Sequence, residues 1–203
     1  MSEDGHEGAR KSDRTRLTIL DAARIAFARK GFSGVTIRDI TDLARVTRAS
    51  FYYYFRDKTE LFIELGTATY REAMGVVETL GAQGEPPTQQ AIEEWVGRYF
   101  EYLDRNGAFV ARSEEDMPQD AAFRAAVARS HRRAATVLGR RIAKIAATPP
   151  RADATSTGLA VMALLERSWL LARHNNVSTM PRDEARAAAS ELVWRTVDYT
   201  LPN

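Results

Sequence analysis

Two short amphipathic segments separated by a three-residue turn constrain the fold of this chain more than any other feature of its sequence. The first segment begins at Thr36, followed three residues later by Asp39 as in a capping box, and the second begins at Thr47. A longer segment with apolar residues every three or four positions precedes them and ends at Gly31. Two short helices packed against a third predict a helix-turn-helix arrangement.

The second short segment, TRASFYYYF, combines a face for burial with a face for contact. Phe51 and Phe55 share one side of the expected helix. Four residues lie about 100° to 180° away from them and should face solvent: Arg48, Ala49, Tyr52 and Tyr53. Arginine at the start of a recognition helix can donate two hydrogen bonds to guanine, and an alanine methyl can contact thymine. The segment therefore indicates contact with DNA bases.

Positive charge is concentrated in the same part of the chain. Residues 10–58 contain twelve Lys and Arg against five Asp and Glu, whereas residues 59–203 contain seventeen against nineteen. This division indicates that the first part meets a polyanion. A general preference for arginine is the alternative, because only four of the 29 basic residues are Lys. The first basic residues form either an arm along DNA or part of a disordered tail: Arg10, Lys11, Arg14 and Arg16.

Residues 15–65 resemble the DNA-binding domain of the TetR family of bacterial transcriptional regulators. The resemblance rests on a Thr-x-Arg-x-Ile start to the second helix, a short turn, and an aromatic third helix that ends in Tyr-x-x-Phe before a lysine. It implies base or groove contacts from four residues: Arg38, Arg48, Ala49 and Tyr53. It implies phosphate contacts from five more: Thr47, Ser50, Tyr52, Tyr54 and Lys58.

Arg45 and Tyr54 need separate comment. Arg45 stands where the family usually has glycine, and a left-handed conformation there would cost a non-glycine residue roughly 1 kcal/mol. Either the turn differs slightly, or Arg45 recovers this cost through a phosphate contact. Tyr54 shares a face with the buried phenylalanines, so its ring belongs either to the core or to the contact surface.

The rest of the chain is expected to form a second, all-helical domain. Helix stops and restarts predict helices at about 88–105, 107–114, 120–147, 153–174 and 182–200, which with four earlier helices makes nine. The expected organisation is a flexible tail over residues 1–11, a helix-turn-helix domain over 12–58, and an effector-binding and dimerisation domain over 59–203.

Aromatic and apolar residues of the second domain either fill a core or line a ligand cavity. As a cavity they would bind a small, largely apolar effector, with a few polar groups to orient it. The candidates are Trp95, Tyr99, Tyr102, Phe109, Met162, Leu165, Glu166, Trp169 and His174. Aromatic stripes at helical spacing are more often core, but TetR-like proteins commonly bind an effector here. The segment around Trp95 and the stretch ALLERSWLLA look faintly like the ethionamide-resistance type of regulator.

The last two expected helices are rich in small residues that permit close packing. In the TetR family these helices pair with their copies in a four-helix dimer interface. The resemblance therefore implies an interface that includes Leu170, Ala185, Ala189, Leu192, Val193 and Val197, and Trp194 belongs either to it or to the core. A twofold dimer could occupy two half-sites about 34 Å apart.

Catalysis finds little support in the sequence. The sequence has three widely separated histidines, no cysteine and no phosphate-binding loop. The usual groupings of nucleophilic or metal-binding residues are therefore missing, and we expect neither enzymatic activity nor a cofactor. The arginines Arg132, Arg133, Arg140 and Arg141 are interpreted as solvated, in preference to a second nucleic-acid site. No apolar run suggests a signal or a membrane span, which predicts a cytoplasmic, nucleoid-associated protein.

Two functions are compared at this stage. The first is a homodimeric repressor that leaves a palindromic operator when a small effector binds. The second is an all-helical carrier of apolar molecules. A carrier has no need for exposed Arg48, Tyr52, Tyr53 and Lys58 on one surface, so the regulator is favoured.

Overall fold

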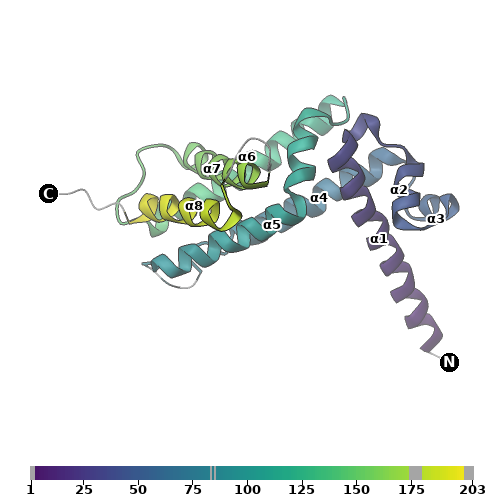
Figure 1. The fold of residues 1–203 in the computed structure, drawn as a ribbon, viewed down its shortest axis with the longest axis horizontal. Coiled ribbons are helices and arrows are strands. Elements are labelled where there is room, and N and C mark those ends of the chain that lie inside the picture. Colours follow the sequence, from purple (N-terminus) through teal and green to yellow (C-terminus); the bar gives the residue numbers. More distant parts are fainter. Residues whose placement is uncertain (1–2, 83, 85, 174–179, 199–203) are drawn as a thin grey trace. The chain divides into compact units, whose positions relative to one another are not determined.

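The computed structural model describes residues 3–82, 84, 86–173 and 180–198, and within them the chain is all-α with eight helices. The expected fold class, an N-terminal helix-turn-helix followed by a larger helical part, is confirmed (Figure 1). The helices are α1 (Glu3–Gly34), α2 (Ile37–Ala44), α3 (Arg48–Tyr54), α4 (Lys58–Val77), α5 (Gln89–Glu115), α6 (Ala121–Ile145), α7 (Ala154–Arg173) and α8 (Arg182–Val197). No described helix has a stretch long and apolar enough to cross a membrane.

The first helix is longer than expected and is interrupted near its end. It begins at Glu3, so residues 3–11, expected as a tail, are helical. No proline interrupts this segment, and each residue added to an existing helix gains a hydrogen bond. At Gly31 the backbone leaves the helical region, with φ 72° and ψ 174°. This supports the prediction that Gly31 ends the regular helix, because a positive φ favours glycine.

The chain separates into two compact units. One contains the residues up to Thr69 together with Ala108–Arg124, and the other contains Tyr70–Gly107 and the residues from Ala125 onward. Three helices, α4, α5 and α6, therefore contribute residues to each unit. This division differs from the expected boundary after residue 58, because the end of α5 and the start of α6 pack with the N-terminal helices.

An aromatic cluster explains why residues 108–124 belong to the first unit. The ring of Phe62 lies 5.0 Å from that of Phe27, 5.3 Å from that of Phe109 and 6.0 Å from that of Phe123, measured between centroids. Phe27, Phe62 and Phe109 are almost fully buried. Edge-to-face contacts of this kind stabilise a core beyond the area they bury. The cluster therefore ties the α5–α6 connection to α1 and α4.

The expected helix break at Asn106-Gly107 was wrong, and α5 runs through both residues. Asn106 is fully buried, and its Nδ2 donates to the Glu72 carboxylate at 2.9 Å and to the Tyr102 carbonyl at 3.2 Å. Gly107 lies beneath the Trp169 indole, which a Cβ at position 107 would approach to 2.7 Å. Here glycine permits close packing against a tryptophan and does not end a helix.

Glycine also sets the crossing of α6 and α7. A Cβ on Gly139 would collide with the backbone of Ala154, and one on Gly158 would collide with the backbone of Ala135. The two helices therefore approach closely enough for backbone to meet backbone, which only glycine allows at both positions. Buried residues of α7 and α8, including Leu165, add to this second core.

Candidate nucleic-acid interface

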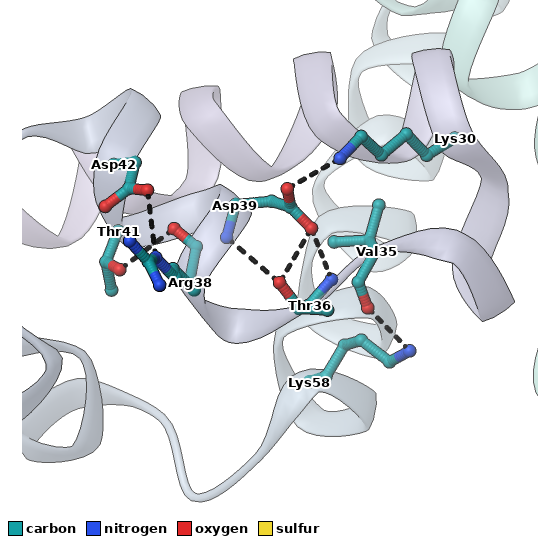
Figure 2. Close-up of polar contacts among 8 residues, drawn as sticks. All are labelled: Lys30, Val35, Thr36, Arg38, Asp39, Thr41, Asp42 and Lys58. Carbon is teal, nitrogen blue, oxygen red and sulfur yellow. Dashed lines mark hydrogen bonds and ion pairs between the residues drawn. The ribbon is translucent and has the colours of Figure 1, made fainter.

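The capping box predicted at Thr36 and Asp39 is present and fixes the start of α2. The Thr36 Oγ1 accepts from the Asp39 backbone N–H at 3.2 Å, and Asp39 Oδ2 accepts from the Thr36 N–H at 2.8 Å. Figure 2 shows Lys30 adding a third partner, with its Nζ 2.6 Å from Asp39 Oδ1. These hydrogen bonds hold the pKa of Asp39 well below its usual range, those from Lys30 and Thr36 contributing most.

The turn between α2 and α3 places Arg45 in the left-handed region. Its φ is 54° and its ψ is 41°, the conformation for which glycine is usual. The N–H of Arg45 donates to the Asp42 carbonyl at 3.3 Å, and that of Val46 donates to the Thr41 carbonyl at 3.1 Å. The turn therefore keeps the glycine-type geometry, with the arginine side chain exposed at its corner.

The recognition helix α3 begins at its predicted cap. Thr47 Oγ1 accepts from the Ser50 N–H at 3.1 Å and lies 3.1 Å from the Ser50 hydroxyl. Phe51 and Phe55 on the opposite side are almost completely buried, as expected. This burial fixes the rotation of α3 about its axis, so the residues on its other face are held toward solvent.

The solvent face of α3 presents an arginine and two tyrosines. Tyr52 is 46% exposed and Tyr53 is 78% exposed, and Arg48 and Ala49 are also exposed. The Arg48 guanidinium lies over the Tyr52 ring at 5.5 Å and donates to its hydroxyl at 3.2 Å. A single exposed aromatic is ordinary on a protein surface, so the informative feature is that Tyr52 and Tyr53 share this face with Arg48. Tyr54 is half-buried against the core cluster, with its ring 4.9 Å from that of Tyr53.

Two basic residues expected to contact DNA, Arg38 and Lys58, differ in their exposure and in their hydrogen bonds. Arg38 is highly exposed, and its Nε lies 3.6 Å from Asp42 Oδ2 (Figure 2). Lys58 is held more firmly, because its Nζ donates to the carbonyls of Phe32 at 2.7 Å and Val35 at 2.9 Å. Burial lowers the pKa of Lys58, although Asp116 opposes this effect. Lys58 thus joins the start of α4 to the α1–α2 connection, and a phosphate contact remains a prediction for it.

Predicted effector residues of the C-terminal unit pack against one another. Trp95, Tyr99, Leu165 and Trp169 are nearly fully buried, as are Tyr102 and Met162. The Tyr99 hydroxyl lies 3.4 Å from Glu166 Oε1, and burial with the nearby Glu166 carboxylate raises the pKa of Tyr99. This pair places a polar contact between α5 and α7 inside an apolar core. Phe109 lies apart from them in the other unit, and His174 falls outside the described residues.

The expected interface residues divide into buried and accessible sets. Leu192 is 49% exposed and Leu170 is half-buried. The other four are buried within the unit's own core: Ala185, Ala189, Val193 and Val197. Trp194 is half-buried and lines a groove of about 1070 Å³ between the start of α5 and α8.

Sequence reasoning missed a polar link between α5 and the end of α1. Asp116 accepts from the Ser33 N–H at 2.9 Å and from the Ser33 hydroxyl at 2.7 Å. Both hydrogen bonds lower the pKa of the Asp116 carboxyl. The two residues are 83 positions apart, so no local pattern in the sequence could have paired them.

The described geometry is that of a helix-turn-helix domain with an exposed recognition helix. The family of bacterial regulatory proteins called TetR matches residues 19–65, which span α2, α3 and parts of α1 and α4. Over residues 19–65 the chain therefore matches the TetR family of bacterial regulatory proteins, as the sequence resemblance predicted.

Two curated relatives match half of this chain or less. The HTH-type transcriptional repressor NicS of Pseudomonas putida is 35% identical over 102 residues, which cover 50% of this chain and 48% of NicS. The HTH-type transcriptional regulator TtgR, also of P. putida, is 41% identical over 51 residues, which cover 25% of this chain and 24% of TtgR. The chain therefore spans about half the length, or less, of these curated relatives.

A solved structure shows that the fold likeness extends further. The reduced form of Escherichia coli NemR covers 91% of this chain and 98% of its own, with a TM-score of 0.68 and 18% identity. At that identity the likeness concerns the fold alone. It supports an all-helical architecture of the same type for both units.

Proposed function

We propose that this chain is a sequence-specific transcriptional repressor that binds a palindromic operator as a homodimer and leaves it when a small, largely apolar effector binds. The observation that carries the proposal is the solvent face of α3. Arg48, Ala49 and Tyr53 project from a helix whose opposite face is anchored by buried Phe51 and Phe55. A rigid helix with exposed base-reading and phosphate-binding groups suits insertion into the major groove.

Repression is supported by the names of related proteins, because NicS is described as a repressor. Homodimer formation is supported by geometry. Leu192 leaves half of a large apolar side chain in solvent on α8, and Leu159 of α7 is 38% exposed. One helix-turn-helix makes few contacts, so two copies on a twofold axis raise both affinity and specificity.

The proposed effector site lies between α5 and α7, where Tyr99 and Glu166 meet. The surrounding side chains are packed without exposure, so an effector must separate these helices to enter. Glu166 could then accept a hydrogen bond from the ligand in place of the one from Tyr99. Such binding favours the open arrangement of α5 and α7 and shifts the protein toward it. Release from DNA follows if the open arrangement binds the operator less tightly.

Binding of fluorescent operator candidates, measured by anisotropy, tests the proposal. The candidates are DNA fragments from upstream of the gene, compared with random duplexes at several salt concentrations. We expect Arg48→Ala to reduce the preference for the operator, because the guanidinium would read guanine. Arg56→Ala is the matched control, since Arg56 is also exposed but lies beyond α3 and pairs with Asp57. It should keep wild-type selectivity.

Two results would contradict the proposal. If Arg48→Ala and Arg56→Ala changed the preference for the operator equally, the solvent face of α3 would not be the surface that reads the sequence. Absence of any preference over random DNA, together with retained binding of apolar ligands, would support the carrier function instead.

A further inference from the structure

The solvent side of α6 carries an array of arginines, and the helix itself contains no acidic residue. The stretch from Ala121 to Ala152 contains eight Lys and Arg and no Asp or Glu, although the whole chain has a net charge of only +2. Arg129, Arg133 and Arg140 are exposed on α6. At 100° per residue they fall within a sector of about 40°, and they extend over about 16 Å along the helix axis. We call these three residues the basic face of α6.

The basic face differs from other arginines on the surface of this chain. Several of those form ion pairs along their own helix, as Arg195 does with Glu191 and Arg24 does with Asp21. Within the described part of the chain, the basic-face residues make no ion pair and no hydrogen bond through their side chains. Arg132, also exposed, lies on the flank of this face and adds a fourth positive charge.

Charge of this kind destabilises the helix that carries it. Arg129 and Arg133 are four residues apart, so their like charges repel across one turn. Arg140 lies two turns beyond Arg133 on the same side of the helix and extends this run of like charge. The first half of α6 has little packing to offset these effects, because none of its residues up to Arg133 is buried. An anionic partner would relieve the repulsion and order this half of the helix.

We propose that the basic face of α6 is a second nucleic-acid contact, which binds the phosphate backbone of double-stranded DNA without reading its sequence. Guanidinium groups match phosphate through paired hydrogen bonds. Duplex DNA carries a charge about every 1.7 Å along its axis, so a straight array finds phosphates in any register. A lipid surface fits less well, because exposed residues beside the arginines are small, such as Ala122, Ala125 and Ala143.

This contact is additional to operator recognition by α3 and does not depend on it. It would hold the protein on DNA of any sequence, through an attraction that weakens steeply with salt. Its residues belong to the C-terminal unit, whereas the helix-turn-helix belongs to the other unit. Substitutions on α6 and on α3 can therefore be studied independently.

The test uses the full chain with Arg129→Gln, Arg133→Gln and Arg140→Gln combined. The matched control combines Arg105→Gln, Arg182→Gln and Arg195→Gln, so it lowers the net charge by the same amount as the basic-face variant. These three arginines form ion pairs with Glu72, Asp104 and Glu191, respectively. Binding to a random duplex is measured by anisotropy at several salt concentrations. Circular dichroism melts establish that each variant is folded at the assay temperature, and single substitutions replace any triple variant that is not.

We expect the basic-face variant to bind random DNA more weakly, with a salt slope shallower by about 0.9 for each phosphate that the variant no longer neutralises. The control variant should keep the wild-type slope. In a background with Arg48→Ala and Tyr53→Ala, the remaining DNA binding should still depend on the basic face. Dependence of random-DNA binding on the basic face could be observed even if the wild-type protein showed no preference for an operator. The experiment therefore distinguishes failure of this proposal from failure of the proposed function.

Equal salt slopes for the basic-face and control variants would overturn the proposal. So would unchanged DNA binding combined with weaker binding to phosphatidylserine vesicles or to a polyglutamate peptide. Those outcomes would assign the surface to an anionic membrane or to an acidic protein segment.

Discussion

At the scale of single residues, Gly107 shows how packing overrides local preference. It lies within α5, where helix propensity alone would favour alanine, yet the Trp169 indole occupies the space of the missing Cβ. Trp169 itself is oriented by its Nε1, which donates to Asp104 Oδ1 at 2.8 Å. The glycine and the tryptophan therefore act as a pair in the core of the C-terminal unit.

Gly107→Ala should lower the free energy of unfolding by about 1–2 kcal/mol, because overpacking against Trp169 outweighs the better helix propensity of alanine. Gly75→Ala is the control, since Gly75 lies in α4 with nothing within 4 Å of a new Cβ. It should raise the free energy of unfolding by about 0.5–1 kcal/mol. Urea denaturation measures both. A stabilising Gly107→Ala would show that the Trp169 contact is not tight.

Lys58 has two proposed roles, one in stabilising the fold and one in contacting DNA phosphate, and they can be measured separately. Lys58→Met should lower the free energy of unfolding by about 1–2 kcal/mol, because it removes two charge-assisted hydrogen bonds to the carbonyls of Phe32 and Val35. Lys30→Met is the control; it removes an exposed ion pair with Asp39 and should cost less.

Salt dependence distinguishes the two roles of Lys58. A phosphate contact would make the salt slope of operator binding shallower by about 0.9 in Lys58→Met. An unchanged slope with weaker binding would leave Lys58 with a purely structural role. Unchanged stability would contradict the hydrogen bonds that the structure assigns to it.

At the scale of elements, the link between Ser33 and Asp116 joins the end of α5 to the kinked end of α1. Together with the Phe62 cluster, it explains why residues 108–124 belong to the DNA-binding unit. Because α5 also carries Tyr99 into the C-terminal core, it contributes residues to both units, as α4 and α6 do.

Acidification should weaken this link. The folded-state pKa of Asp116 is depressed by Ser33, so its carboxylate contributes stability above the unfolded pKa of about 3.9. That stability disappears as the pH falls through the folded value. Asp116→Asn should therefore lower stability at neutral pH and reduce its further decline in acid, as measured by thermal melts between neutral and acidic pH.

A double-mutant cycle with Ser33→Ala provides the check. If the two side chains interact, the double variant should be little less stable than either single variant, with a coupling of at least about 0.5 kcal/mol. Additive losses of stability would show that Asp116 acts through other partners, such as the Ser33 backbone N–H, Arg112 and Lys58.

The sequence was most informative where contacts are local. Capping at Thr36 and Thr47, the buried face of α3 and the exposed Tyr53 all follow from residue spacing within a few turns. It failed where distant segments decide the outcome. The continuity of α5 through Asn106 depends on Glu72 of α4, and the place of Asp116 depends on Ser33. Neither pairing leaves a signal at short range.

At the scale of the whole molecule, the proposed interface must use outward residues of α7 and α8. The small residues of α8 suggested close helix pairing, but Ala185, Ala189 and Val193 are used within the chain's own core. Leu192 remains on the outside. Burial of these small residues could not be predicted from periodicity alone, because α8 has small or apolar side chains on more than one face.

The most direct test of the central claim is a footprint of the purified protein on DNA from upstream of its gene, with analytical ultracentrifugation of the complex. We predict protection of two inverted half-sites about 34 Å apart, or a multiple of this spacing, with a guanine in each and an even number of chains bound. Loss of the guanine protection in Arg48→Ala would identify the recognition helix. Protection without symmetry or guanine, or no protection at all, would contradict the account of α3 as the reader of an operator.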